Sequence, residues 1–394
     1  MLLVFSLVIA FKEMYLSDLW HTPGVDFGKH YEAAQRVWKG RSPFTDDLYL
    51  SFNYPQFVAW TSLPLLLFPD IRSAEKAWDL FNVFLIFLTA AIVIFGFRPR
   101  RAPSNEADRT PFEMLKRHWW IPAIFLTFFF YPNTDGLVQG NLSPWVLVTM
   151  TLLGWMAVTN RDTGIGVMIA LCGLMKLMPF LLIIPYLAGW RKKVLRAAGL
   201  VWGIYFMVLL VTRTWKYELY YITKVIPHIG AYWHHVSYSL PYVLMRIISR
   251  KASCNVGLMK WVSNLWVLVM IGSYIIICWR SRRRIREEGG HVLFFALGTL
   301  LLPLLPPLLE YLHFVWFFPG MVIIILYFLE HPLPWTSSIP IFILLLLLSI
   351  AGPMADVLYF AHFSLIGLTP VCGLILYILL ARLLLLDRTG KMNL

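Results

Sequence analysis

The stretch Leu80–Phe97 reads LFNVFLIFLTAAIVIFGF and is followed at once by Arg98-Pro99-Arg100-Arg101. The apolar run contains no charged side chain. A helix needs about 20 such residues to cross the hydrocarbon core of a bilayer. Basic clusters beside a span tend to stay on the cytoplasmic side. This stretch therefore predicts a transmembrane helix whose C-terminal end is cytoplasmic.

The same composition continues along the chain. Of its 394 residues, 59% are hydrophobic and 14% are charged, against roughly 45–50% and about 25% in soluble domains. We therefore expect a single all-α, polytopic membrane domain covering residues 1–394. The first apolar run lacks a basic start and a small-residue cleavage site, so it is expected to be a retained helix. About twelve spans are predicted, at residues 1–16, 74–97, 119–132, 143–159, 164–176, 178–190, 196–213, 259–279, 291–305, 314–330, 339–353 and 366–383.

Two of these spans and one further apolar run are short. The spans 164–176 and 178–190 are separated by Lys176 and Pro179, which favours broken or re-entrant helices buried in protein. The run Val58–Phe68 has only eleven residues, with a proline inside it. It is expected to lie at the interface or to dip into the bilayer.

The net charge of +13 raises the question of nucleic-acid binding. The basic residues, however, cluster in the short links 98–117, 191–196 and 280–286, which is the positive-inside pattern of a membrane protein. We therefore expect no nucleic-acid partner and two cytoplasmic termini. The long segments 17–73 and 214–258, rich in Trp and Tyr, then face outward. No CxxC occurs, so neither a zinc site nor a disulfide framework is indicated.

The first outward segment carries the strongest signal for chemistry. Asp26 is expected to cap a short helix that runs to about Trp38 and ends at Gly40, because Asp is favoured at helix N-termini. His30 follows on the same helix face. The alternative is that Asp26 is only a cap and His30 only a surface residue.

Polar residues recur at four later positions. Asn141 lies in a short outer turn, where an ordinary turn is the alternative. Lys176 lies in an apolar run, where a charge is expensive and indicates function unless it snorkels to the interface. Glu310 and His313 follow a proline-broken helix and are spaced to pair with each other. The fourth position is the loop around His234-His235, whose adjacent side chains diverge and do not predict a metal site.

In this order, these segments resemble glycosyltransferase family 87 of the GT-C superfamily. The resemblance rests on Asp26 with Tyr31-x-Ala33-Ala34, Gly40-x-x-Pro43-Phe44, Tyr54-Pro55, Gly140-Asn141, Lys176-x-x-Pro179, Ser237-x-Ser239-Leu240, Arg246 and the turn ending at His313. The chain departs from the family at Gln56, where a second proline is frequent. It also departs at Val236 and Tyr238, where asparagine and glutamine are frequent.

The resemblance implies a GT-C fold with short extracytoplasmic helices in the first outer loop, and it implies that Asp26 is the catalytic base. A base at this position fits the chemistry, because the acceptor hydroxyl must lose a proton as it attacks. The leaving phosphate needs nearby positive charge, for which the candidates are Lys176, His313 and Arg246. The candidates for other substrate contacts are His30, Tyr31, Tyr54, Gln56, Asn141, Ser237, Ser239 and Glu310.

The expected function is an inverting transfer of a sugar, mannose, from a polyprenyl-phosphate donor to a lipid-linked or envelope glycan. It is expected at the outer face of the plasma membrane. A single phosphate does not require a divalent metal, so no cofactor is expected.

One rival is a flippase for lipid-linked sugars, which would show inverted repeats and midplane charges. A second is a glycan ligase or polymerase, which would need more outward arginines around a diphosphate.

Overall fold

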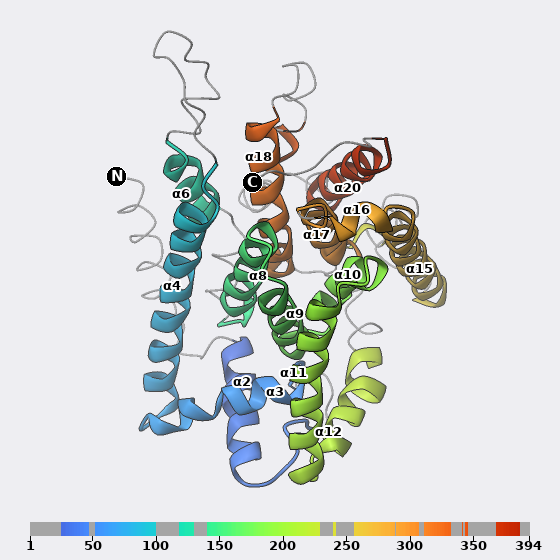
Figure 1. Cartoon of the computed structure of the whole chain (residues 1–394). Coiled ribbons are helices and arrows are strands. Elements are labelled where there is room, and N and C mark those ends of the chain that lie inside the picture. Colours follow the sequence, from blue (N-terminus) through green and yellow to red (C-terminus); the bar gives the residue numbers. More distant parts are fainter. Residues whose placement is uncertain are drawn as a thin grey trace.

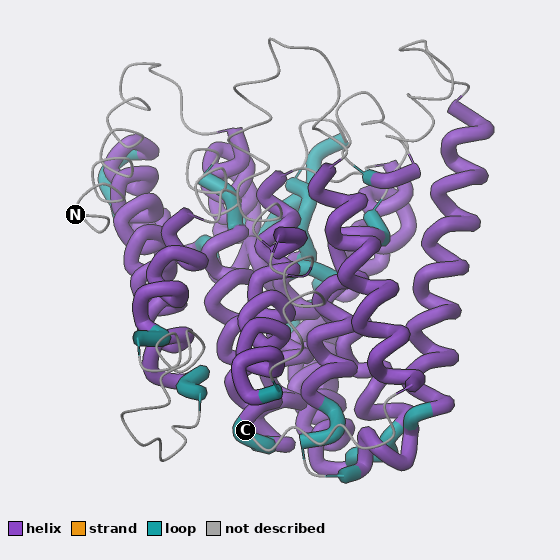
Figure 2. The backbone as a smooth tube through the Cα atoms, turned by 90° about the horizontal axis from the view of Figure 1, so that it is seen from above, coloured by secondary structure: helices purple, strands orange, loops and turns teal. Residues whose placement is uncertain are grey.

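All of the regular structure in the described residues is helical (Figures 1 and 2). In the part of the chain that the structure describes, this confirms the all-α prediction. The structure is a computed structural model, and it describes residues 25–46, 52–99, 118–129, 140–228, 239–241, 256–287, 289–306, 311–331, 341, 343–345 and 368–386.

The helices agree closely with the apolar runs of the sequence. The α-helices longer than six residues are α2 (Val25–Trp38), α4 (Ile71–Gly96), α6 (Trp120–Phe129), α8 (Ser143–Val158), α9 (Asp162–Met175), α11 (Lys192–Val211), α15 (Val256–Arg280), α17 (Val292–Leu301), α18 (Phe318–Glu330) and α20 (Leu368–Leu386). Short helical elements are α3 (Gln56–Thr61), η1 (Leu63–Leu67), η3 (Met178–Ile183), α10 (Ile184–Ala188), α12 (Trp215–Tyr220), η4 (Tyr221–Val225), α16 (Arg282–Arg286), η5 (Leu302–Leu304) and η6 (Tyr311–Phe317).

Four stretches of helix in the described part of the chain are long and apolar enough to cross a membrane. They are Ile71–Gly96, Lys192–Val211, Lys260–Arg280 and His313–Glu330. The other apolar helices are shorter, and the predicted total of about twelve spans remains a prediction. The run expected to lie at the interface forms two short helices, α3 and η1, rather than a span.

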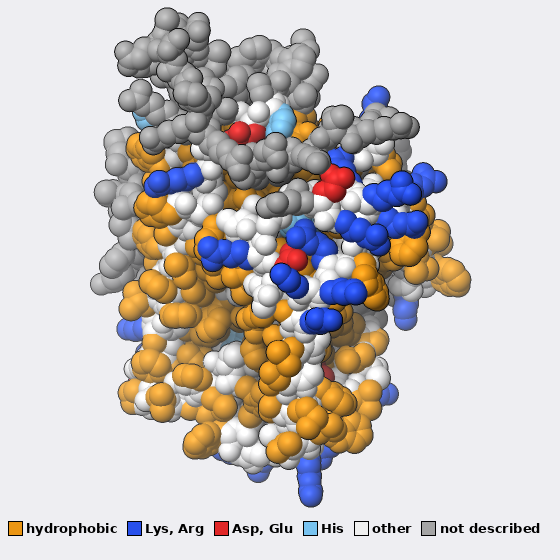
Figure 3. Space-filling view, in the orientation of Figure 1, with side chains coloured by type: hydrophobic (Ala, Val, Ile, Leu, Met, Phe, Trp, Pro, Cys, Tyr) orange, Lys and Arg blue, Asp and Glu red, His pale blue; other side chains and the backbone are white. Residues whose placement is uncertain are grey.

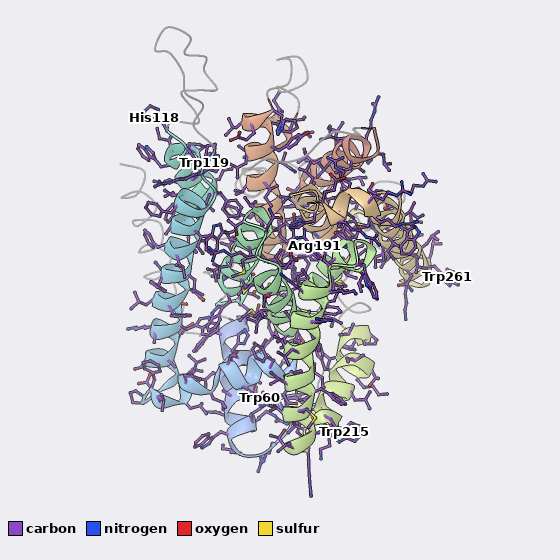
Figure 4. All side chains as sticks on the ribbon, in the orientation of Figure 1. Trp60, His118, Trp119, Arg191, Trp215 and Trp261 are labelled. Carbon is purple, nitrogen blue, oxygen red and sulfur yellow. The ribbon has the colours of Figure 1, made fainter. Side chains whose placement is uncertain are left out.

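The helices give the molecule two distinct ends. The segment 17–73, which was expected to face outward, contains α2 and α3, and these lie with α12 at the lower end in Figure 1, whereas α6 and α16 lie in the upper half. Figure 4 places Trp60 and Trp215 toward the lower end and His118 and Trp119 at the upper end.

The break predicted between the fifth and sixth spans is present. Helix α9 ends at Met175, and Lys176 has an extended backbone with φ −145° and ψ 128°. The short helix η3 then begins at Met178, with Pro179 in its first turn. Proline lacks an N–H group, and its ring clashes with the carbonyl four residues earlier, here that of Met175. The break therefore frees Lys176 from the helix at the lower end.

A glycine allows α9 to lie close against α11. A Cβ atom on Gly166 would lie only 2.2 Å from the carbonyl oxygen of Val194. Small residues permit this close approach of helix backbones in membrane proteins. The pair fixes the position of α9, at whose end Lys176 lies.

Candidate active site

The Asp26 carboxylate lies between α2 and the turn that precedes α8. It accepts a hydrogen bond from Asn141 Nδ2, and the Lys29 ammonium lies 3.3 Å from its Oδ1. The expectation that Asp26 is the N-cap is wrong, because α2 begins at Val25 and Asp26 lies within its first turn. Its side chain remains 16% exposed, so the carboxylate is held in place and is still accessible.

Asn141 connects three segments of the chain. Its Nδ2 also donates to the Tyr54 hydroxyl at 2.8 Å. Its Oδ1 accepts from the backbone N–H of Ser143 at 3.0 Å and from the Ser143 hydroxyl at 2.8 Å. A backbone N–H can only donate, so this contact fixes which end of the amide faces Ser143. The amide nitrogen is thereby directed toward Asp26 and Tyr54.

Gly140 allows this turn to lie directly on α2. Its φ is +63°, and a Cβ atom there would lie 2.7 Å from the Cβ of Phe27. Glycine adopts positive φ without strain. The carbonyl of Gly140 also accepts from Trp78 Nε1 at 3.0 Å. The turn that carries Asn141 is thus attached to both α2 and α4.

Lys176 lies beside the same tyrosine. Its ammonium nitrogen is 5.5 Å from the centre of the Tyr54 ring and 5.7 Å from that of Trp316, within the range of cation–π attraction. The His313 ring is 5.3 Å from the Trp316 ring. Lys176 therefore contacts aromatic rings of this cluster rather than only snorkelling to the interface, and the Trp316 ring connects it to His313.

His30 lies on α2 next to Tyr54 and is fully buried. Its ring stacks on Tyr54 at 4.9 Å and lies 5.3 Å from Trp78 and 5.6 Å from Phe52. Neither ring nitrogen has a hydrogen-bond partner among the residues that the structure describes. Burial lowers the pKa of His30, the negative charge of Asp26 opposes the shift and the positive charge of Lys176 adds to it, and the net pKa is about 4. The surface-residue alternative is therefore wrong, and the imidazole is neutral at neutral pH.

The segment that contains Tyr54 and Gln56 is also attached to α12. The Glu218 carboxylate accepts from the backbone N–H of Gln56 at 3.1 Å and from the Tyr205 hydroxyl at 3.0 Å. Phe44 lies 5.9 Å from the ring of Tyr221. Glu218 was not among the site residues expected from the sequence, although it is the only acidic residue in the segment 214–258.

The predicted site residues separate into three groups. Asp26, His30, Tyr54, Asn141, Lys176 and His313 are linked through the contacts described above. Gln56 and Ser239 are buried, and Tyr31 lies 6.2 Å from the ring of Phe27. Outside the described residues lie Ser237, Arg246 and Glu310.

The cluster combines groups that suit two chemical tasks. An accessible, oriented carboxylate suits proton abstraction. The Lys176 ammonium, which lies beside the same Trp316 ring as His313, suits an anion. No group of three or more His, Cys, Asp or Glu side chains suited to a metal occurs among the described residues.

Comparison with known proteins identifies one family. The model of glycosyltransferase family 87 matches residues 52–307. This range contains Tyr54, Gln56, Asn141 and Lys176, whereas Asp26 and His313 lie outside it. No curated protein matches the chain.

Proposed function

This chain belongs to glycosyltransferase family 87, and we propose that it transfers mannose from a polyprenyl-phosphate donor to a lipid-linked or envelope glycan. The observation that carries the proposal is the Asn141 amide. It donates to both the Asp26 carboxylate and the Tyr54 hydroxyl, and the Lys176 ammonium lies against the Tyr54 ring. The Asn141 amide thus holds the candidate base, Asp26, and also the tyrosine against which the candidate anion-binding group, Lys176, lies.

In the proposed reaction, Asp26 is the general base. Its carboxylate takes the proton of an acceptor hydroxyl while that oxygen forms a bond to the anomeric carbon of the donor. The bond between that carbon and the phosphate oxygen breaks, and the phosphate leaves with the electron pair. A single displacement of this kind inverts the anomeric configuration. The hydrogen bond from Asn141 orients the carboxylate for this role.

Lys176 and His313 are proposed to bind the donor phosphate. Negative charge increases on the bridging oxygen as the phosphate leaves, and a positive group placed there lowers the barrier. Lys176 is connected to His313 through Trp316, which supports a shared task. Arg246 is the third candidate on sequence grounds.

The proposal is tested with purified full-length protein, polyprenyl-phosphate-mannose and a panel of membrane glycolipids, with products identified by mass spectrometry. We expect one glycolipid to gain a hexose. Asp26→Asn keeps the size of the side chain and removes the base, and it should lower turnover about 10²–10⁴-fold. The matched control is Asp46→Asn in the same loop, which is exposed and should keep activity. Near-normal turnover in Asp26→Asn would exclude the proposed base.

The site is proposed to face outward from the plasma membrane, with both termini cytoplasmic, on the basis of the basic links. Single cysteines at Ser42 and Ser104 test this orientation in intact cells, after Cys254 is replaced by serine. A membrane-impermeant thiol reagent should label the first position and not the second. Labelling of both positions from outside would overturn the orientation.

A further inference from the structure

A band of exposed cations lies in the upper part of the molecule as seen in Figure 3, away from α3 and α12. Helix α11 begins there and α16 lies nearby, with Arg286 Nε donating to the carbonyl of Gly189 at 3.1 Å. Lys and Arg side chains gather over this region in Figure 3. We call this surface the basic rim, and its exposed members are Lys192, Lys193, Arg196, Arg282, Arg283 and Arg286.

The acidic residues near the basic rim do not neutralise it. Asp162 pairs with Arg191 at 2.7 Å, and neither residue is a member of the rim. Glu287 is exposed beside α16 and offsets one of the six charges. The rim therefore keeps a positive excess within the described part of the chain and suits an anionic partner.

Aromatic and apolar side chains adjoin the rim. Trp190 and Trp279 are 60% and 59% exposed, and the Arg282 guanidinium lies 5.1 Å from the Trp279 ring. Leu200 on α11 and Leu268 on α15, the helix that carries Trp279, are 65% and 69% exposed. Trp is enriched where lipid headgroups meet the hydrocarbon. This order of cations, tryptophans and exposed leucines matches the order of phosphate, glycerol and acyl chain in a phospholipid.

We propose that the basic rim binds the headgroups of anionic phospholipids in the adjacent leaflet. Each Lys or Arg close to an anionic bilayer surface contributes to the electrostatic attraction between protein and lipid. Added salt weakens this attraction by screening the charges. A soluble acidic protein would match the charges but would not account for the exposed tryptophans and leucines beside them. The inference does not depend on the proposed transfer reaction.

The test uses purified full-length protein in neutral detergent, with binding of phosphatidylglycerol and phosphatidylcholine measured by native mass spectrometry. Phosphatidylglycerol should bind more tightly than phosphatidylcholine, and this advantage, the ratio of the two affinities, should fall with added salt. The quadruple variant Lys192→Gln, Lys193→Gln, Arg282→Gln and Arg283→Gln should lose about tenfold or more of that advantage.

Two controls make the result decisive. The control variant Lys39→Gln, Arg41→Gln, Arg72→Gln and Lys216→Gln removes the same number of exposed charges away from the rim and should bind lipid as the wild type does. Exchanging Lys for Arg and Arg for Lys at the four rim positions keeps the charge and should keep binding. Equal binding of the two lipids by the wild type, or equal loss in the rim and control variants, would overturn the proposal.

Discussion

The Glu218 carboxylate accepts a hydrogen bond from the backbone N–H of Gln56 at 3.1 Å, across 162 positions of the sequence. Gln56 follows Tyr54 by two residues, so this bond holds the backbone that carries the tyrosine. The Tyr205 hydroxyl donates to the same carboxylate oxygen at 3.0 Å. Burial raises the pKa of Glu218, while these two hydrogen bonds oppose the shift. Glu218 thus connects the second outer segment to the site.

Glu218→Ala should lower both stability and turnover. The N–H of Gln56 and the hydroxyl of Tyr205 would lose their acceptor, and an unpaired buried donor costs about 1–3 kcal/mol. Thermal unfolding and the assay with polyprenyl-phosphate-mannose measure the two effects. Glu218→Gln keeps an acceptor and should recover most of both, and Tyr205→Phe should lose less than Glu218→Ala. Wild-type behaviour of Glu218→Ala would show that the bond does not position Tyr54.

Lys176→Met should weaken donor binding more than acceptor binding. Methionine keeps the apolar stem against Tyr54 and Trp316 and removes only the charge that would face the phosphate. Binding of the sugar-free polyprenyl phosphate, measured by calorimetry, should weaken by about tenfold or more, since hydrogen bonds to charged groups contribute about 1.5–3 kcal/mol. Lys216→Met, at an exposed position on α12, is the matched control. Unchanged phosphate affinity in Lys176→Met would remove this lysine from the donor site.

The buried His30 should make the protein sensitive to acid. Its pKa is lowered from 6.5 to about 4 in the folded state, so the unfolded state binds the proton more readily between these values. The contribution of His30 to the free energy of unfolding is therefore fully present above pH 6.5. It is lost as the pH falls toward 4, and the loss amounts to about 3 kcal/mol in total. Melting temperatures in detergent from pH 7.5 to 4.5 should therefore fall steadily.

His30→Gln should flatten this pH dependence, because glutamine does not titrate. Its melting temperature at neutral pH need not match that of the wild type, since the change in slope is the diagnostic quantity. His331→Gln, at the far end of α18, is the control and should keep the wild-type slope. An unchanged slope in His30→Gln would show that another group causes the loss in acid.

Local features of the sequence predicted the helices well. The expected spans 143–159 and 259–279 correspond to Ser143–Val158 and Val256–Arg280, because apolar length and helix-breaking residues act over short distances. The break at Pro179 was predicted for the same reason. Asp26 was assigned wrongly as a cap, because α2 begins one residue earlier, and its partner Asn141 could not be foreseen because it lies 115 residues away. Contacts across such separations depend on how helices pack, and no local pattern encodes them.

The candidate site was only partly predictable for the same physical reason. Chemical type and context selected Asp26 and Lys176 from the sequence, since a carboxylate opening a short polar helix just past a span is unusual and a charge within an apolar run is costly. The burial of His30 and the attachment of Gln56 to Glu218 became known only from the tertiary structure. Whether a polar residue faces the site or the core depends on neighbours from other helices.

Transfer should continue in excess EDTA. The proposed donor carries one phosphate, and Lys176 with His313 supplies positive charge without a cation. Divalent ions prefer several oxygen ligands, and Asp26 already accepts from Asn141 and pairs with Lys29. Turnover measured before and after chelation, with a metal-dependent glycosyltransferase treated in parallel, tests this expectation. Loss of activity that Mg²⁺ or Mn²⁺ restores would contradict it and would direct attention to Asp46 and Asp47, whose alanine variants should then lose the restored activity.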